Sequence, residues 1–339
     1  MYTLEEYLKY YGNLDLDSQR WNTQDNLICS LLSYLTVDNF NEEKNLKQFY
    51  EFVRNKEEIV IKDYTCRNSY SILKKLLECS RYKDMRFISS KRILDNTAMF
   101  GALTIRINDL TIVSFKGSDH SSIAWKENFR LFYQYPTYTQ TLAVDYLNNV
   151  IGDKIYVNGH SKGGNLAIVS SMEVNEEIFD KIISIDNFDG PGLRLEEFNS
   201  TKYQRVLPKL INYLPTNSYI GSLFYNQNYK YIKTNTIGVS IHYPFNWALF
   251  GTMFIEGKST SFSERINMMS TQNYNKIDQI RYREIMENIL SEIPEDENGM
   301  LKLNLKELKR IINNIQEVDE QTKDYIFSMF STIFTGVIR

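Results

Sequence analysis

The chain has 339 residues, of which 42% are hydrophobic, and its formal net charge at pH 7 is −3. This length suits one large α/β core with helical additions, and the small charge argues against a nucleic-acid partner or a strongly basic membrane-binding face. No apolar run reaches the ~18 residues of a transmembrane helix, and the polar, amphipathic start predicts no secretory signal.

The first 95 residues are predicted to be mostly helical. Residues 23–35 begin with a capping signal and place apolar side chains at helical spacing, and residues 68–80 suggest a second helix. Two β-rich runs follow at residues 102–107 and 110–115, and Asn108-Asp109 between them predicts a hairpin.

Between residues 100 and 250, predicted strands and helices alternate. They are helices near 122–134 and 139–151, a strand–turn–helix unit at 155–168, a strand at 181–188, and β-rich segments near 205–214 and 230–241. Such alternation predicts the α/β fold class, with a largely parallel central sheet covered by helices on both faces. Residues from 262 onward return to helix. We therefore predict one domain over 1–339, comprising a helical N-terminal region (1–95), a sheet core (96–255) and a helical C-terminal region (256–339).

The most informative stretch, residues 155–168, reads IYVNGHSKGGNLAI. Residues 159–163 match the pattern G-x-S-x-G, after an apolar strand-like run and before a helix start. A sharp turn here lifts the serine hydroxyl from the end of the sheet, and the glycines let strand and helix pack closely. The helix N-terminus directs N–H groups toward the point where an oxyanion would form. The stretch therefore predicts a nucleophile elbow at Ser161, rather than an ordinary glycine-rich turn.

Further blocks occur in order along residues 23–250. They are 24–35, 113–119 (VSFKGSD), 125–129 (WKENF), 188–192 (FDGPG), 214–221 (LPTNSYIG), and His242 with Trp247. Together with the elbow, they resemble the Mbeg1-like bacterial family of the α/β-hydrolase superfamily and, more distantly, the class 3 (fungal-type) lipases. The resemblance implies an α/β-hydrolase fold and serine-hydrolase chemistry. No motif covers the helical tail beyond residue 260.

A serine nucleophile needs a base, and the chain has three histidines. His160 adjoins Ser161 on the same turn, so it is expected to point away and pack beneath the elbow. His120 lies too close to the preceding loop to match the expected order. His242 follows the last β-rich segment, where α/β-hydrolases carry their base, and the resemblance places the family's histidine there. We predict His242 as the base; the alternative is a surface-loop histidine beside Pro244.

Two backbone N–H groups are expected to form the oxyanion hole. One belongs to Lys162, which follows the nucleophile. The other is implied by the resemblance, because residues 115–119 are similar to the F-R-G-[ST] block of class 3 lipases, which assigns Ser118 a donating N–H and hydroxyl. The simpler alternative is a polar turn at the end of a strand.

The acidic member is where the sequence departs from the lipase pattern. Class 3 lipases carry an aspartate in an N-D-x-V-P segment, and the similar residues 217–221 have Ser218 at that position. In one interpretation Ser218 orients a neutral imidazole, although it cannot stabilise an imidazolium as a carboxylate does. In the other, Asp189 supplies the carboxylate from the preceding strand end, unless it only caps a turn. Asp186 is a third candidate, and the sequence leaves the choice open.

These residues predict a serine esterase or lipase in which Ser161 attacks a small-molecule ester or lipid and His242 transfers the protons. The sequence implies no cofactor or metal. The histidines are scattered, and the cysteines form no C-x-x-C pair; they are Cys29, Cys66 and Cys79. Sparse, unpaired cysteines fit a cytoplasmic location. The rival hypothesis is a catalytically inactive hydrolase-like module that binds a lipid or protein partner. A Ser161–His242 hydrogen bond would favour the enzyme.

The helical regions outside the sheet core carry apolar stripes that must be buried. One such stripe consists of Leu305, Leu308, Ile312 and Ile315. These regions either complete the hydrophobic cover of the core or roof the serine as a lid. The side chains that would form the apolar surface of a lid are Phe327, Met329, Phe330 and Phe334.

Overall fold

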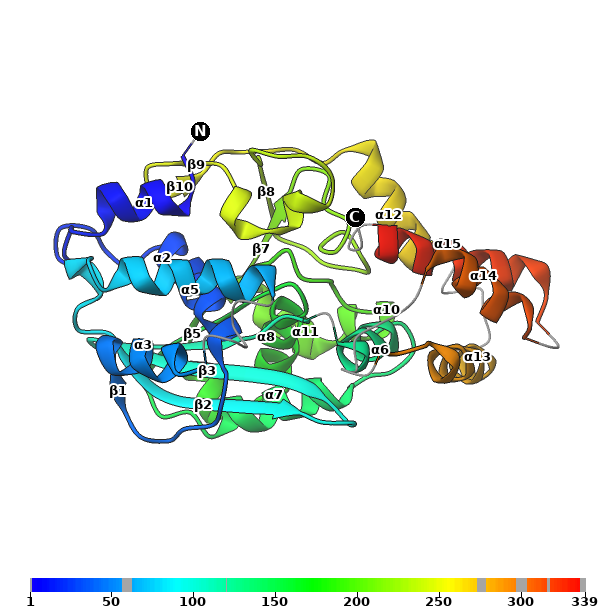
Figure 1. Cartoon of the computed structure of the whole chain (residues 1–339), viewed down its shortest axis with the longest axis horizontal. Coiled ribbons are helices and arrows are strands. Elements are labelled where there is room, and N and C mark those ends of the chain that lie inside the picture. Colours follow the sequence, from blue (N-terminus) through cyan, green and yellow to red (C-terminus); the bar gives the residue numbers. More distant parts are fainter. Residues whose placement is uncertain are drawn as a thin grey trace.

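The computed structural model of the chain describes residues 2–56, 63–119, 121–272, 279–296, 304–315 and 318–335. Its centre is an eight-stranded sheet in which the strands lie in chain order (Figure 1). The strands are β1 (Lys44–Asn45), β2 (Arg86–Leu94), β3 (Met99–Ile107), β4 (Leu110–Phe115), β5 (Lys154–His160), β6 (Ile182–Phe188), β7 (Leu210–Pro215) and β8 (Tyr229–Ile232). A separate hairpin is formed by β9 (Leu249–Phe250) and β10 (Met253–Phe254).

The sheet has an antiparallel edge and a parallel remainder. Strands β1 to β4 pair antiparallel, and Ile107 pairs with Leu110 across the predicted turn, where Asn108 has a φ of 50°. From β4 to β8 every pair is parallel. The predicted α/β class with a largely parallel sheet is therefore confirmed.

The connections between the parallel strands carry helices, and all of them except the first contribute to the cover of one face. These helices are α6 (Ser122–Arg130), α7 (Tyr138–Asn148), α8 (Lys162–Glu173), α9 (Glu176–Lys181), α10 (Leu195–Phe198) and α11 (Thr201–Val206). Because the strand order never reverses, right-handed crossovers place successive helices on the same side of the sheet. Val113, Val157 and Ile185 point to that side and form one apolar core with α7, α8 and α11.

The other face is covered by the N-terminal helices α1 (Leu4–Tyr11), α2 (Thr23–Leu32), α3 (Leu46–Arg54) and α5 (Tyr64–Leu76). Alternation along the strands turns Leu103, Ile105 and Phe188 toward these helices, which form a second apolar core with them. In Figure 1, α2 and α5 lie above β2 and β3. The predicted cover on both faces is thus supplied from two different parts of the chain.

The structure refines two sequence predictions in this region. Residues 1–95, which are predicted to be mostly helical, also supply β1 and β2 to the sheet. The strand β2 lacks a two-residue apolar alternation, and only its pairing with β3 makes it a strand. The β-rich segment near 205–214 is a strand only over β7, and the one near 230–241 only over β8, before the 3₁₀ helix η4 (Gly238–His242).

The C-terminal helices pack on α6 at one end of the molecule (Figure 1). They are α12 (Ser261–Gln272), α13 (Gln279–Glu292), α14 (Leu305–Asn313) and α15 (Glu320–Thr335). In the predicted stripe, Leu308 and Ile312 are buried whereas Leu305 is 38% exposed. Phe330 is fully buried, with its ring centroid 3.9 Å from that of Phe129.

The two proposed roles of the C-terminal region rest on different residues. Ile315 and Phe327 pack at the edge of the same apolar cluster as Phe330, which agrees with a covering role. The side chains of Met329 and Phe334, which were candidates for a lid surface, lie outside the described part of the structure. No helix among the described residues has both the length and the apolar character needed to cross a bilayer.

Candidate active site

Ser161 sits at a strained turn between β5 and α8. Its φ of 58° and ψ of −133° are a conformation that residues with a Cβ rarely adopt. Hydrogen bonds on both sides hold it: the Ser161 N–H donates to the Phe188 carbonyl oxygen at 2.9 Å, and the Gly164 N–H donates to the Ser161 carbonyl oxygen at 2.9 Å. The surrounding structure thus fixes the strained serine, as a nucleophile elbow requires.

The glycines of the elbow are required by close approach. A Cβ at Gly159 would lie 2.2 Å from the Gly163 carbonyl oxygen, where strand and helix meet. A Cβ at Gly163 would lie 2.1 Å from the Phe115 carbonyl oxygen at the end of β4. Only glycine lets α8 start this close to both strands, so the spacing in the motif has a steric cause.

The structure places His242 between Ser161 and Asp189. The His242 Nε2 lies 3.0 Å from the Ser161 Oγ, and the His242 Nδ1 lies 2.6 Å from Asp189 Oδ2. The side chains of His242 and Asp189 are 12% and 1% exposed. Because a carboxylate oxygen only accepts, Nδ1 carries the proton and Nε2 is left to accept from the serine hydroxyl. These three side chains have the connectivity of a Ser–His–Asp triad.

Sheet register explains why Asp189 is adjacent to Ser161. His160 pairs with Phe188 at the ends of the parallel strands β5 and β6, so the residues that follow leave the sheet side by side. Asp189 also has a positive φ of 53°, and its N–H donates to the Tyr213 carbonyl oxygen at 2.9 Å. Its carboxylate is therefore held toward the elbow.

Ser218 contacts the carboxylate instead of the imidazole. Its hydroxyl donates to Asp189 Oδ1 at 2.5 Å, and the Gly221 N–H donates to the same oxygen at 3.2 Å. Burial raises the pKa of the Asp189 carboxyl, and the hydrogen bonds from His242, Ser218 and Gly221 oppose that shift. The two alternatives left open by the sequence are thus joined in one arrangement, with Asp189 against His242 and Ser218 behind Asp189.

The loop that carries Ser118 lies against the elbow. A Cβ at Gly117 would lie 2.7 Å from the His160 carbonyl oxygen, so the two backbones nearly touch. The Ser118 hydroxyl donates to Asn128 Oδ1 of α6 at 2.9 Å. The sequence did not identify Asn128 as the partner of the Ser118 hydroxyl. Its position in the block at 125–129, ten residues after Ser118, is the feature that could have indicated this contact.

Lys162 presents only its backbone to the site. Its side chain is buried, and Nζ donates to the Met99 carbonyl oxygen at 3.3 Å. Burial lowers the pKa of the Lys162 ammonium, and the negative charges of Glu127 and Asp119 oppose this shift. Lys162 is the first residue of α8, so its N–H is one of the N-terminal groups that have no partner within the helix, and it remains the predicted oxyanion donor.

The remaining histidines take no part in the triad-like arrangement. His160 is buried and points away from Ser161, as predicted, with Nδ1 2.8 Å from the Tyr34 hydroxyl and Nε2 2.8 Å from the His242 carbonyl oxygen. His120 lies outside the described residues. Tyr34 lies in the block at 24–35, but no sequence pattern assigned it a role in the site, because only the fold brings it against His160.

Asp186, the third candidate acid, is buried away from His242. It accepts a hydrogen bond from the Asn26 side-chain amide at 2.6 Å, and burial raises its pKa to about 6. Its folded-state pKa thus exceeds the ordinary value of 3.8. The stability that the protonated Asp186 carboxyl contributes is fully present below pH 3.8. It is lost as pH rises through about 6, because the buried carboxyl must then ionise.

We therefore expect Asp186→Asn to stabilise the fold at pH 8 and to have little effect at pH 4. The gain at pH 8 is on the order of 3 kcal/mol, from the difference between the two pKa values. Urea unfolding of both proteins at the two pH values measures it. A variant that is less stable than the wild type at pH 8 would show that Asn26 compensates fully for burial of the charge.

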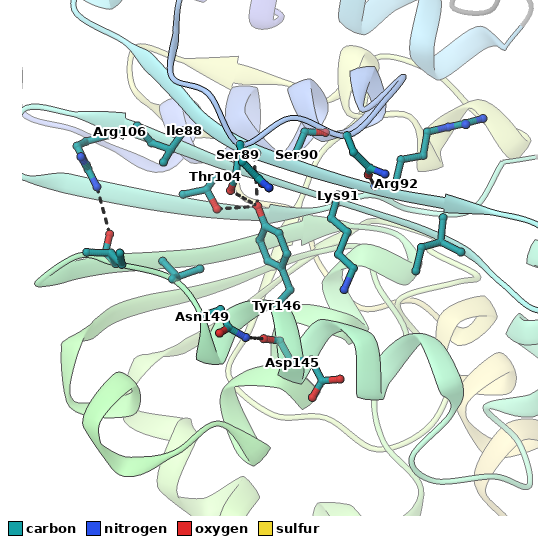
Figure 2. A pocket seen from close by; sticks show the side chains of 15 residues that line it. Ile88, Ser89, Ser90, Lys91, Arg92, Thr104, Arg106, Asp145, Tyr146 and Asn149 are labelled. Carbon is teal, nitrogen blue, oxygen red and sulfur yellow. Dashed lines mark hydrogen bonds between the residues drawn. The ribbon is translucent and has the colours of Figure 1, made fainter.

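A cavity of about 730 Å³ lies away from these residues, between β2, β3 and the end of α7 (Figure 2). The Tyr146 hydroxyl at its centre bonds to the hydroxyls of Ser89 at 2.9 Å and Thr104 at 2.8 Å. Arg106 donates to the Ile151 carbonyl oxygen at 3.3 Å. Because its central polar groups bond to one another, the cavity is not included in the candidate site.

No group of three histidine, cysteine, aspartate or glutamate side chains suited to a metal ion occurs in the part of the chain that the structure describes. The donor set around Ser161 contains one imidazole and one carboxylate, which are already bonded to each other. The side chains of the site thus form one line of hydrogen bonds, from the Ser161 hydroxyl through the His242 imidazole to the Asp189 carboxylate.

Comparison with known proteins shows a family and a weak structural likeness. The family model described as Mbeg1-like matches residues 76–291. The crystal structure of M37 lipase is similar over 58% of this chain and 67% of that chain, at 14% sequence identity and a TM-score of 0.36. A likeness at this level carries no argument about activity. No curated protein sequence matches the chain.

Proposed function

The chain belongs to the Mbeg1-like family, as its motifs predicted, and from the geometry of its site we propose that it is a serine hydrolase of lipase or esterase type. The observation that carries the proposal is the line of hydrogen bonds from Ser161 Oγ through His242 to Asp189, at 3.0 Å and 2.6 Å. This line favours the enzyme over a binding module that has lost activity, because a module without turnover needs no base aligned on the serine.

The reaction begins when Ser161 Oγ attacks the carbonyl carbon of a carboxylic ester and His242 Nε2 takes its proton. Asp189 stabilises the imidazolium and holds its Nδ1–H in place. The carbonyl oxygen of the ester, which now carries a negative charge, accepts hydrogen bonds from the N–H groups of Lys162 and Ser118. It lies at the N-terminus of α8, where the helix dipole stabilises negative charge.

The tetrahedral intermediate collapses when the bond to the alcohol oxygen breaks and His242 gives its proton to that oxygen. An acyl-enzyme on Ser161 remains. Water then attacks the acyl carbon while His242 takes a proton from it. The second intermediate collapses when the bond from the acyl carbon to Ser161 Oγ breaks, His242 returns the proton to Ser161 Oγ, and the acid is released. The chain's own side chains carry out every proton transfer in this cycle.

The test is labelling of the full chain with a fluorophosphonate probe, followed by rates with p-nitrophenyl esters of graded acyl length. We expect one adduct on Ser161 and measurable hydrolysis, because the probe reacts only with a serine that has an aligned base and oxyanion hole. The control is Ser161→Ala, which should lose both and keep its melting temperature. Labelling of the alanine variant, or an unreactive wild type, would reject the proposal and favour the binding module.

A further inference from the structure

His160 bonds to two parts of the site through opposite edges of its ring. Its Nδ1 meets the Tyr34 hydroxyl at 2.8 Å, and its Nε2 meets the His242 carbonyl oxygen at 2.8 Å. The ring centroids of His160 and His242 are 4.6 Å apart. His160 and Tyr34 are both buried, at 1% and 3% exposure. A side chain next to the nucleophile thus contacts the main chain of the residue that carries the base.

The direction of each hydrogen bond follows from the partners. A carbonyl oxygen only accepts, so the proton of His160 lies on Nε2. Burial lowers the pKa of His160 well below its usual value, with a smaller effect of His242, so the ring is neutral and Nδ1 accepts. Burial raises the pKa of Tyr34 well above its usual value, so its hydroxyl keeps its proton and donates to Nδ1.

The Tyr34 hydroxyl also lies against the backbone of Gly117. A Cβ at Gly117 would lie 2.1 Å from the Tyr34 hydroxyl oxygen, so the turn fits the tyrosine only because residue 117 is glycine. A close backbone contact at Gly117 and two hydrogen bonds therefore connect Gly117 through Tyr34 and His160 to the carbonyl of His242. One end adjoins Ser118, the predicted oxyanion donor, and the other belongs to His242, the predicted base.

The two ends of this series of contacts, Gly117 and His242, need support from other parts of the structure. Gly117 lies in a loop after β4, and His242 ends the 3₁₀ helix η4, so neither is held by a sheet ladder or an α-helix. Tyr34, in contrast, belongs to the 3₁₀ helix η1 (Ser33–Leu35), directly after the fully buried α2. His160 is the last residue of β5. The rigid middle therefore fixes the positions of the two irregular ends.

We propose that Tyr34 and His160 are positioning residues, which set the oxyanion loop at Gly117–Ser118 and the main chain of His242 relative to Ser161. This inference rests on the proposed function. It also gives the N-terminal helices a role in the site, since they supply Tyr34.

The first test is Tyr34→Phe, which removes one oxygen and keeps the ring. Loss of an oxyanion-hole donor lowers kcat by about 10²- to 10³-fold, and an indirect effect on its position should be smaller, roughly 10- to 100-fold. We expect kcat for a p-nitrophenyl ester and the rate of fluorophosphonate labelling to fall by this factor, while KM changes by less than about twofold.

The matched control is Tyr82→Phe. Tyr82 is as buried as Tyr34, but its hydroxyl donates to Asp25 at 2.7 Å, in a cluster with Arg81. This variant should lose stability in urea and keep its kcat. Wild-type kcat in Tyr34→Phe, or equal losses of kcat in both variants, would overturn the inference.

The second pair of variants is His160→Gln and His160→Leu. Glutamine keeps one donor and one acceptor, so it should retain more of kcat than leucine, and a larger loss in His160→Gln than in His160→Leu would contradict the inference. If His160→Leu does not fold, Tyr34→Phe still decides. A wild type that neither reacts with the probe nor hydrolyses esters would reject the proposed function, and this inference with it, before any Tyr34 variant is measured.

Discussion

Asp189→Asn is expected to lower kcat by about 10⁴-fold, as in a serine protease that loses the same carboxylate. The structure shows how the change would act. Oδ1 of Asp189 receives two donors, the Ser218 hydroxyl and the Gly221 N–H. An asparagine must keep its oxygen at that position, so its NH₂ group would face His242 Nδ1. The imidazole would then carry its proton on Nε2, where it cannot accept the proton of Ser161.

The comparison that tests this assignment is Ser218→Ala. It removes one hydrogen bond to the carboxylate but leaves Gly221 in place and His242 paired with Asp189, so we expect a loss of kcat of about tenfold or less. His242→Ala sets the scale, with a loss on the order of 10⁶-fold if it behaves as the base. Steady-state rates with one ester, together with urea unfolding of each variant, separate activity from stability. A Ser218→Ala loss as large as that of Asp189→Asn would make Ser218 the principal partner of His242.

Truncation after residue 260 is expected to give insoluble or unfolded protein. The helices α12 to α15 form an apolar cluster with α6 and the turn after it. The members of that cluster which would lose their cover include Trp125, Phe129, Phe132, Leu223 and Phe224. Replacing a single buried phenylalanine by alanine costs about 3–5 kcal/mol, so exposing five large side chains exceeds the stability of an ordinary domain.

Polar contacts point to the same conclusion. Glu287 of α13 bonds to Arg130 at 3.1 Å and to the Tyr133 hydroxyl at 2.8 Å, and Glu295 bonds to Lys126 and the Ser122 hydroxyl, both at 2.6 Å. All four partners lie on or next to α6, whose Asn128 holds the Ser118 hydroxyl. The tail therefore also supports the oxyanion loop indirectly.

A single substitution tests the same packing without removing the C-terminal helices. Phe330→Ala leaves the chain intact and removes the ring that stacks on Phe129, so it should lower the free energy of unfolding by about 3–5 kcal/mol. The measurements are solubility, cooperativity of urea unfolding and ester hydrolysis. A truncated chain that is soluble, cooperatively folded and more active than the wild type would instead assign the tail the role of a lid.

The sequence by itself determined the local part of the site. The elbow at 155–168 was readable because glycines at fixed spacing, an apolar strand and a helix start are all set by neighbouring residues. The hairpin at Asn108-Asp109 and the capped helix from Thr23 were readable for the same reason. The strand at residues 86–94 was not predicted because that segment has no strand pattern of its own, and its pairing with β3 imposes the strand.

Only the tertiary structure shows that Asp189, and not Ser218, contacts the imidazole of His242. Both lie at strand ends after Ser161, and a linear pattern does not tell which side chain reaches the imidazole. The register of β5 with β6 brings Asp189 beside the elbow, and Ser218 then bonds to its far oxygen. The contact of Tyr34 with His160 spans 126 residues and depends on helices from the N-terminus covering the second face of the sheet. Contacts of this kind are fixed by the packing of distant segments, which no local preference encodes.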